Sequence, residues 1–325
     1  MTIVSLAVIL LACSIFVNAI EWVGKKLNFH EGVVGSVFAA VGTALPETII
    51  PIIAIVFATG EGADQIGIGA IAGAPFMLST LTFFITGAAV IIYTLSGKRT
   101  LRMNVDVNIF SKDLTFFIAI YGIAVLTTFI HNHILIRSAI AIVLLLSYIY
   151  YLKVTLAEDA DAVEDVDPLY FTRFFKLPTN LTWIIAQLMV GLVAITLGAH
   201  LFIGYVEDMS KMLGIAPLIL SIIITPIATE LPEKMNSVMW IARKKDTLAL
   251  GNITGAMVFQ SCFPVVFGIL FTPWDLRGIT MVSAIIALCS AVMILAWVKI
   301  RKSLNPFILL FGGVLYAVFI FYVFA

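Results

Sequence analysis

Long apolar runs separated by short polar segments dominate the chain. A membrane-spanning helix needs roughly 20 consecutive, mostly apolar residues, and the sequence supplies ten such runs. The predicted spans are residues 2–20, 32–58, 65–95, 113–131, 133–153, 181–206, 213–241, 247–272, 278–298 and 304–324. The pattern therefore predicts an all-α polytopic membrane protein with ten transmembrane helices.

Composition supports this class. Apolar residues make up 62% of the chain and charged residues 12%, whereas a soluble domain has roughly 45–50% and about 25%. The first apolar run lacks a basic segment before it, so we expect a retained helix and not a signal peptide. The net charge is zero, which gives no reason to expect a nucleic-acid partner. No nucleophile motif or phosphate loop indicates an enzyme.

Basic residues are divided unevenly between the two ends of the predicted helices. Of the 19 Lys and Arg residues, 15 fall in the connections on one side, three fall on the other side, and Lys234 lies within a span. Because cytoplasmic loops carry the excess of Lys and Arg, we expect both termini outside the cytoplasm. The expected location is a plasma (prokaryotic inner) membrane, with an organellar membrane as the alternative.

One long polar connection, residues 154–180, separates five predicted helices from the next five. It carries six acidic residues between positions 158 and 167. We interpret it as a solvated cytoplasmic linker. A regulatory cation-binding segment is the alternative, although the spacing does not fit an EF-hand. The predicted units are a first five-helix repeat (1–153), the acidic loop (154–180) and a second five-helix repeat (181–325).

The two halves share a polar motif within their second helix. Residues 27–48 align without gaps on residues 213–234. This alignment pairs Thr43 with Thr229, Pro46 with Pro232, and Glu47 with Glu233. A five-helix unit crosses the membrane an odd number of times, so its second copy must be inverted. Inverted repeats are typical of secondary transporters, whose sites lie near the midplane where the halves meet.

Each copy of the motif, T-x-L-P-E, is suited to holding a cation. Proline frees a backbone carbonyl one turn earlier, and such groups need a partner inside a membrane. Thr and Glu four residues apart share one helix face, so the two copies offer hydroxyl and carboxylate oxygens together. Oxygen ligands suit hard cations such as Na⁺ or Ca²⁺. A kinked helix with a protonated, packed glutamate is the structural alternative.

Two segments in each half resemble signatures of the sodium/calcium exchanger family, within the cation/calcium antiporter superfamily. "GTALPE" (42–47) and "ATELPE" (228–233) are similar to G-T-S-L-P-E. "GAIAGAPFML" (69–78) and "GNITGAMVFQ" (251–260) are similar to G-N-x-x-G-S-N-x-F-N/D. The resemblance implies ten helices in two inverted halves and antiport of cations. It also implies ion-binding roles for the signature glutamates, the threonines and the preceding turn: Glu47, Glu233, Thr43, Thr229, Ala40 and Pro226.

The sequence departs from the family pattern at several ligand positions. The signature serine is Ala44 in one half and Glu230 in the other, and the last polar residue of the second signature is Leu78 or Gln260. Glu230 and Gln260 therefore join the candidate ligands, while the number and identity of bound ions stay open. Calcium is the first expectation because the two signature glutamates balance one divalent cation.

Glu230 and Lys234 lie four residues apart on one predicted helix face. We interpret them as a self-neutralising pair. In the alternatives, Lys234 replaces one coupling cation or Glu230 adds a ligand that can bind a proton. The proton-coupled branch of the family carries A-T-E-L, which residues 228–231 match, but the repeat alignment places Glu233 opposite Glu47.

The leading hypothesis is an alternating-access antiporter that exchanges Ca²⁺, or a related cation, for Na⁺. The second, third, seventh and eighth helices are expected to form the core, with the first and sixth sliding across them. Expected partners are transported cations and membrane lipid, with no separate cofactor and a monomeric protein. The alternatives are an H⁺-coupled antiporter and a non-transporting membrane sensor or subunit.

Overall fold

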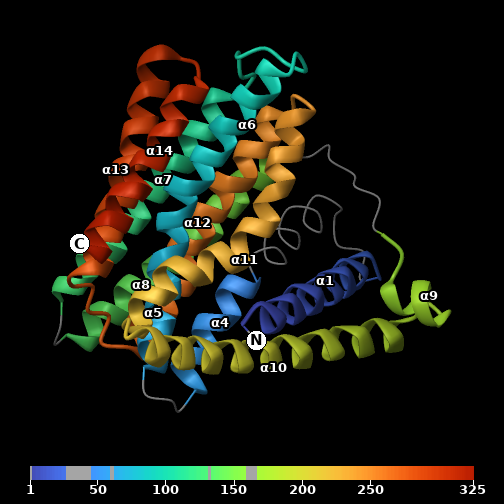
Figure 1. Ribbon diagram of the computed structural model, residues 1–325. Helices are drawn as coiled ribbons and strands as arrows, with labels where there is room; N and C mark the ends of the chain where they lie inside the picture. Colours follow the sequence, from blue (N-terminus) through green and yellow to red (C-terminus); the bar gives the residue numbers. More distant parts are fainter. Residues whose placement is uncertain (1, 27–44, 59–61, 131–132, 159–166) are drawn as a thin grey trace.

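The computed structural model describes residues 2–26, 45–58, 62–130, 133–158 and 167–325, and all regular structure within these ranges is helical (Figure 1). The elements of the first half are α1 (Thr2–Lys26), α4 (Leu45–Val56), α5 (Ala63–Met77), the π-helical segment η2 (Leu78–Thr82), α6 (Phe83–Leu95), α7 (Val107–Leu126), the 3₁₀ turn η3 (Thr127–Phe129) and α8 (Ile134–Glu158). Those of the second half are α9 (Tyr170–Phe175), α10 (Leu181–Leu213), α11 (Pro217–Ala242), α12 (Asp246–Phe271), α13 (Ile279–Arg301) and α14 (Pro306–Phe324).

The prediction of an all-α membrane protein is confirmed. Within the described ranges, seven helical runs are long and apolar enough to cross a membrane: 63–95, 107–129, 134–155, 181–213, 246–271, 279–301 and 306–324. Three shorter apolar helices are Val4–Ala19, Glu47–Val56 and Pro217–Glu230. The first part of the predicted span 32–58 lies outside the described residues.

Helix ends differ from the predicted spans where capping residues override hydropathy. α7 begins before residue 113 because the Asp106 carboxylate accepts hydrogen bonds from the backbone N–H groups of Asn108 (2.8 Å) and Ile109 (3.2 Å). α10 continues past residue 206 until Gly214, whose φ of 66° ends the helix in the left-handed conformation. The predicted polar connection also contains one short helix, α9.

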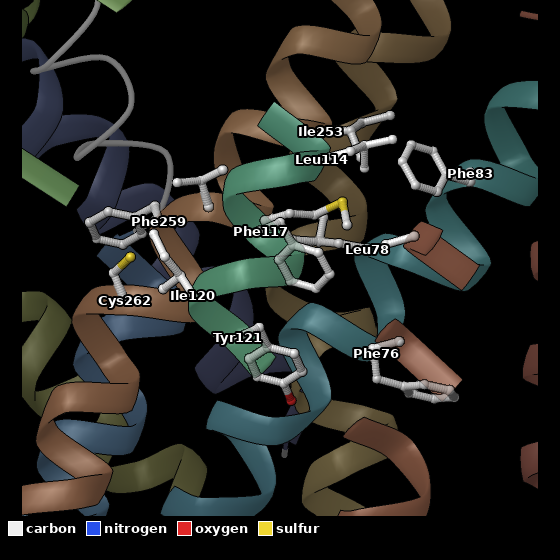
Figure 2. Packing of buried hydrophobic residues seen from close by; sticks show 14 of the residues in the cluster. Phe76, Leu78, Phe83, Leu114, Phe117, Ile120, Tyr121, Ile253, Phe259 and Cys262 are labelled. Carbon is white, nitrogen blue, oxygen red and sulfur yellow. The ribbon is translucent and has the colours of Figure 1, made fainter. Parts of the chain in front are cut away.

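The largest apolar cluster forms around α7 (Figure 2). Leu114, Phe117 and Tyr121 recur at helical spacing and are fully buried. Figure 2 shows these side chains between residues of α5, η2 and α6 and residues of α12. The face of α7 that carries them thereby joins helices from both halves of the chain into one core.

The first and sixth predicted helices, α1 and α10, lie side by side and cross the remaining helices at a steep angle (Figure 1). Close approach is allowed at Gly191, where an added Cβ would lie 2.9 Å from the Cβ of Phe16. The buried amides of Asn18 and Gln187 join the two helices through a 3.0 Å hydrogen bond. The two helices therefore form one paired unit.

α5 and α11 bring the two halves together at the centre of the molecule. Gly73, in the "GAIAGA" segment, faces the α11 backbone so closely that an added Cβ would lie 2.5 Å from the carbonyl oxygen of Ile222. The same Cβ would lie 2.8 Å from Cγ of Pro226. The hydroxyl of Ser221 donates a 2.6 Å hydrogen bond to the carbonyl of Ile66 across this interface. These contacts hold the first half of α11 against the first half of the chain.

Candidate cation-binding site

Glu47 lies in the first turn of α4, where the apolar helix packs against α5, α10, α11 and α12. Its side chain is 4% exposed, and neither carboxylate oxygen has a hydrogen-bond partner within the described part of the chain. Pro51 follows four residues later and has no N–H, so the main-chain carbonyl of Glu47 lacks its usual helical donor. Glu47 therefore has two carboxylate oxygens without a hydrogen-bond partner in the described ranges, and a main-chain carbonyl oxygen without its usual helical donor.

Glu230 occupies the middle of α11 and is 1% exposed. Both of its carboxylate oxygens also lack hydrogen-bond partners in the described ranges. The neighbouring Thr229 is fully buried, and its hydroxyl donates to the carbonyl of Thr225 at 2.9 Å. That bond uses the hydroxyl proton and leaves oxygen lone pairs available to a cation.

Gln260 lies on α12 and is 1% exposed. Neither atom of its amide has a partner among the residues that the structure describes. Pro264 comes four residues later, so the main-chain carbonyl of Gln260 also loses its helical donor. The combination of an unpaired side chain and a proline one turn later is thus common to Glu47 and Gln260.

Electrostatic interactions connect the buried side chains of Glu47, Glu230 and Lys234. Glu47 and Glu230 repel each other, and Lys234, itself only 4% exposed, attracts both carboxylates. Buried polar groups are normally hydrogen-bonded, and an isolated buried charge is strongly unfavourable. A cation that enters between the carboxylates would supply the missing partner. The side chains of Glu47, Glu230 and Gln260 are buried on three helices that pack against one another, and none has a hydrogen-bond partner in the described ranges. We refer to these three residues as the acceptor cluster.

The chemistry of the acceptor cluster suits a hard cation. The atoms that it offers to a metal ion are oxygens, with no thiolate or imidazole. Such ligands favour Na⁺, Ca²⁺ and similar ions over Zn²⁺ or Cu²⁺. No group of three or more His, Cys, Asp and Glu side chains that could hold a metal is found among the described residues.

The structure brings together some of the residues predicted from the sequence. Glu47 and Glu230 interact, and Pro226, Thr229 and Gln260 are buried on neighbouring helices. Thr43 and Ala40 lie outside the described residues, as does the side chain of Glu233. Glu230, which the repeat alignment did not set opposite Glu47, is thus within electrostatic reach of it.

Glu230 and Lys234, which the sequence analysis interprets as a self-neutralising pair, attract each other electrostatically. The carboxylate of Glu230 makes no hydrogen bond to Lys234. The lysine instead acts on both Glu230 and Glu47.

Sequence analysis did not single out Asp113, a buried acid on α7 that is 2% exposed. Its carboxylate accepts hydrogen bonds from the hydroxyls of Tyr151 (3.0 Å) and Thr254 (2.6 Å). The only sequence signal was its position at the edge of the predicted span 113–131. These hydrogen bonds connect α7 to α8 and α12.

Comparison with known proteins identifies the family. The model for "sodium/calcium exchanger protein" matches residues 1–157 and 183–325. The chain belongs to the sodium/calcium exchanger family. Members of this family are multi-pass membrane proteins that transport ions, so the chain is a membrane transporter by descent and not an enzyme.

Relatives of this exchanger-family chain are distant in sequence but cover most of it. An uncharacterized membrane protein of Methanocaldococcus jannaschii is 23% identical over 271 residues, which are 83% of this chain and 81% of the relative. The solved structure of the H⁺/Ca²⁺ exchanger CAX superposes with a TM-score of 0.72 at 14% identity, covering 100% of this chain and 81% of that one. The sodium-calcium exchanger NCX_Mj gives 0.59 at 19% identity, covering 98% and 99%. These likenesses establish the exchanger fold.

Proposed function

We propose that this chain is a secondary-active antiporter that exchanges Ca²⁺, or a related cation, for Na⁺ by alternating access. The observation that carries the proposal is the acceptor cluster, with four carboxylate oxygens buried and without hydrogen-bond donors in the described ranges. Glu47 comes from the first half of the chain and Glu230 from the second. Ionisable groups inside a membrane mark ion pathways, and transporter sites lie between repeated halves.

The proposed architecture is ten transmembrane helices in two inverted five-helix repeats, residues 1–153 and 181–325, joined by the acidic loop 154–180. The seven long apolar runs and the three shorter apolar helices support this count. The bias of Lys and Arg supports an orientation with both termini outside the cytoplasm. We propose a monomer in the plasma (inner) membrane, in contact with lipid and the transported cations.

The proposed ligand set extends the acceptor cluster with residues of the two signature motifs. Glu47, Glu230 and Gln260 supply side-chain oxygens, and Thr229 supplies a hydroxyl oxygen. The remaining proposed ligands are Thr43, Glu233, and the main-chain carbonyls of Ala40 and Pro226. Each lies in or beside a motif that resembles the family's signatures.

Exchange follows from the cost of leaving the acceptor cluster empty. Two buried carboxylates without donors disfavour any state that closes them off from water on both sides. A bound cation removes that cost, so the closed intermediate is accessible to the loaded protein and inaccessible to the empty one. Na⁺ and Ca²⁺ compete for the same oxygens, and each therefore crosses only in exchange for the other. The paired helices α1 and α10 are the proposed moving unit.

The test is uptake of radiolabelled Ca²⁺ into proteoliposomes loaded with Na⁺. We expect Na⁺-driven uptake by the wild type, and a loss of more than tenfold for Glu47→Gln and for Glu230→Gln, because each removes one formal charge from the site. The matched control is Asp208→Asn, which changes an exposed acid on α10 in the same way and should transport normally. Full uptake by both glutamine variants would refute the site.

Exchange of Ca²⁺ for H⁺ is a second candidate, favoured by one observation. Glu230 places a second carboxylate beside Glu47 where the family signature has serine, and a carboxylate can bind a proton where a serine hydroxyl does not. Uptake driven by a pH gradient in Na⁺-free buffer would identify this coupling. A non-transporting sensor or subunit would show uptake with neither gradient.

A further inference from the structure

Lys234 is a third buried charge at the acceptor cluster, and the proposed exchange does not use it. It lies one helical turn after Glu230 on α11 and is 4% exposed. Lys is almost never fully buried unless its charge is balanced. Within the described part of the chain, the charges that balance it are the carboxylates of Glu230 and Glu47.

Two features distinguish this lysine from an ordinary structural ion pair. Its ammonium group forms no hydrogen bond with either carboxylate of the cluster, since all four oxygens are without partners in the described ranges. It also acts on both Glu47 and Glu230, which lie on different helices. A structural lysine would be expected to hold one carboxylate in a fixed, hydrogen-bonded geometry.

The sum of charges at the cluster gives Lys234 a specific consequence. Glu47, Glu230 and Lys234 together carry a single negative charge, to which the proposed ligand Glu233 would add a second; without the ammonium group the total would be one unit more negative. A protein-borne cation of this kind cannot diffuse away. It therefore stays with the protein throughout the exchange cycle, whereas a dissolved monovalent cation must bind and leave.

We propose that Lys234 takes the place of one monovalent cation in the exchange cycle and so lowers the number of Na⁺ ions moved per Ca²⁺ by one. This inference rests on the proposed antiport. The ammonium group reduces the negative charge at Glu47 and Glu230 that dissolved cations must balance. Lys234 is thus a residue that determines ion stoichiometry and is not itself a ligand of the transported ion.

The test compares Lys234→Met, which keeps the length of the side chain and removes its charge, with Lys234→Arg, which keeps the charge. Lys244→Gln is the matched control because it removes an exposed positive charge just after α11. Proteoliposomes with a clamped membrane potential are brought to flux balance at several Na⁺ gradients. The logarithm of the Ca²⁺ gradient is plotted against the logarithm of the Na⁺ gradient. The slope of this plot gives the number of Na⁺ ions exchanged per Ca²⁺.

We expect this slope to rise by one for Lys234→Met and to stay at the wild-type value for Lys234→Arg and Lys244→Gln. A second measurement does not depend on transport. Purified Lys234→Met should bind one more radiolabelled Na⁺ per protein at saturation, and in Na⁺-free buffer its Ca²⁺ affinity should rise by about tenfold because a repelling charge has gone. Lys234→Gln replaces the methionine variant in both assays if that variant does not fold.

The outcomes separate this inference from the antiport on which it rests. A wild type without Na⁺-driven Ca²⁺ uptake refutes the proposed function. A wild type that exchanges, together with an unchanged slope for Lys234→Met, refutes the role of Lys234. If the methionine variant does not transport, unchanged Na⁺ binding per protein refutes that role equally.

Discussion

Two groups of buried charged side chains in this molecule differ in the hydrogen bonds that they receive. Asp246 begins α12, and Arg99, from the connection between α6 and α7, donates to both of its carboxylate oxygens at 2.8 and 2.9 Å. Arg99 donates a further hydrogen bond to the carbonyl of Ile241 at 2.8 Å. The backbone N–H of Asn104 donates to the same carboxylate at 2.8 Å. In the acceptor cluster, by contrast, the carboxylates of Glu47 and Glu230 receive no hydrogen bond within the described ranges.

Burial alone therefore does not distinguish a structural charge from a functional one. Asp246 is 2% exposed and Glu47 is 4% exposed, so both have lost their hydration. The difference is that the protein replaces the water around Asp246 with its own donors, whereas the described residues supply none to the carboxylate of Glu47. A desolvated carboxylate without hydrogen-bond donors needs a countercharge or a bound cation, and this contrast is the basis for the predictions that follow.

The largest effect is expected where the charge is fully paired. Asp246→Asn leaves the guanidinium group of Arg99 buried without its countercharge, and such a loss costs about 3–5 kcal/mol. The measurement is the free energy of unfolding in mixed micelles titrated with SDS. Asp208→Asn, at an exposed position of α10, should change stability by less than about 0.5 kcal/mol. Equal stability of the two variants would break the comparison.

The next effect concerns stabilisation by ligand. Glu47→Gln and Glu230→Gln each remove one of two buried carboxylates and leave the other to balance Lys234, so we expect cation-free stability to be unchanged or slightly higher. Wild-type protein at a Ca²⁺ concentration of 100 times its Kd should gain about 2.7 kcal/mol. Either glutamine variant should gain much less at the same concentration. The measurement is the unfolding free energy with and without Ca²⁺. A wild-type gain that both variants keep would place the Ca²⁺ site elsewhere.

A smaller effect is expected at a second paired carboxylate. Thr254→Val removes the hydroxyl that donates to Asp113 at 2.6 Å while the bond from Tyr151 remains. Loss of one hydrogen bond to a charged group costs about 1.5–3 kcal/mol. Uptake of Ca²⁺ per folded molecule should be unchanged, because this network fastens helices and binds no ion.

The matched control for Thr254→Val is Thr196→Val. Thr196 is exposed on α10, and its hydroxyl bonds only its own helix, at the carbonyl of Leu192 (2.9 Å). We expect its unfolding free energy to change by less than about 0.5 kcal/mol. A loss of uptake in Thr254→Val at full stability would move Asp113 from the structural group to the functional one.

Most of the helical architecture could be predicted from hydropathy, because an apolar helix long enough to cross a membrane is a strong local signal. The starts and ends were less predictable. The first turns of α7 are polar, and Asp106 defines their beginning through a capping bond that hydropathy does not register. Gly214 likewise ends α10 well beyond the predicted apolar run.

The candidate site was predicted in kind but not in detail. The T-x-L-P-E motif singled out Glu47, because an acid and a proline are both costly inside a membrane. The repeat alignment set Glu233 opposite Glu47 and gave no sign that Glu230 interacts with Glu47. Residues three apart on a helix share a face, so an alignment of repeats does not separate these two positions. Arg99 and Asp246, 147 positions apart, carry no local pattern that pairs them.

The smallest effect is expected for Gln260→Met, which tests most directly how a buried polar group without hydrogen bonds differs from one that is fully hydrogen-bonded. Gln260→Met replaces an amide that has no partner in the described ranges with an apolar side chain of similar length. An unsatisfied buried polar group costs about 1–3 kcal/mol, so this variant should be as stable as the wild type or up to about 1 kcal/mol more stable. Because a candidate oxygen ligand is lost, Ca²⁺ affinity, measured by titration calorimetry, should fall severalfold. A variant that is destabilised and binds Ca²⁺ normally would show that Gln260 belongs with Asp246, as a group whose role is to hold the helices together.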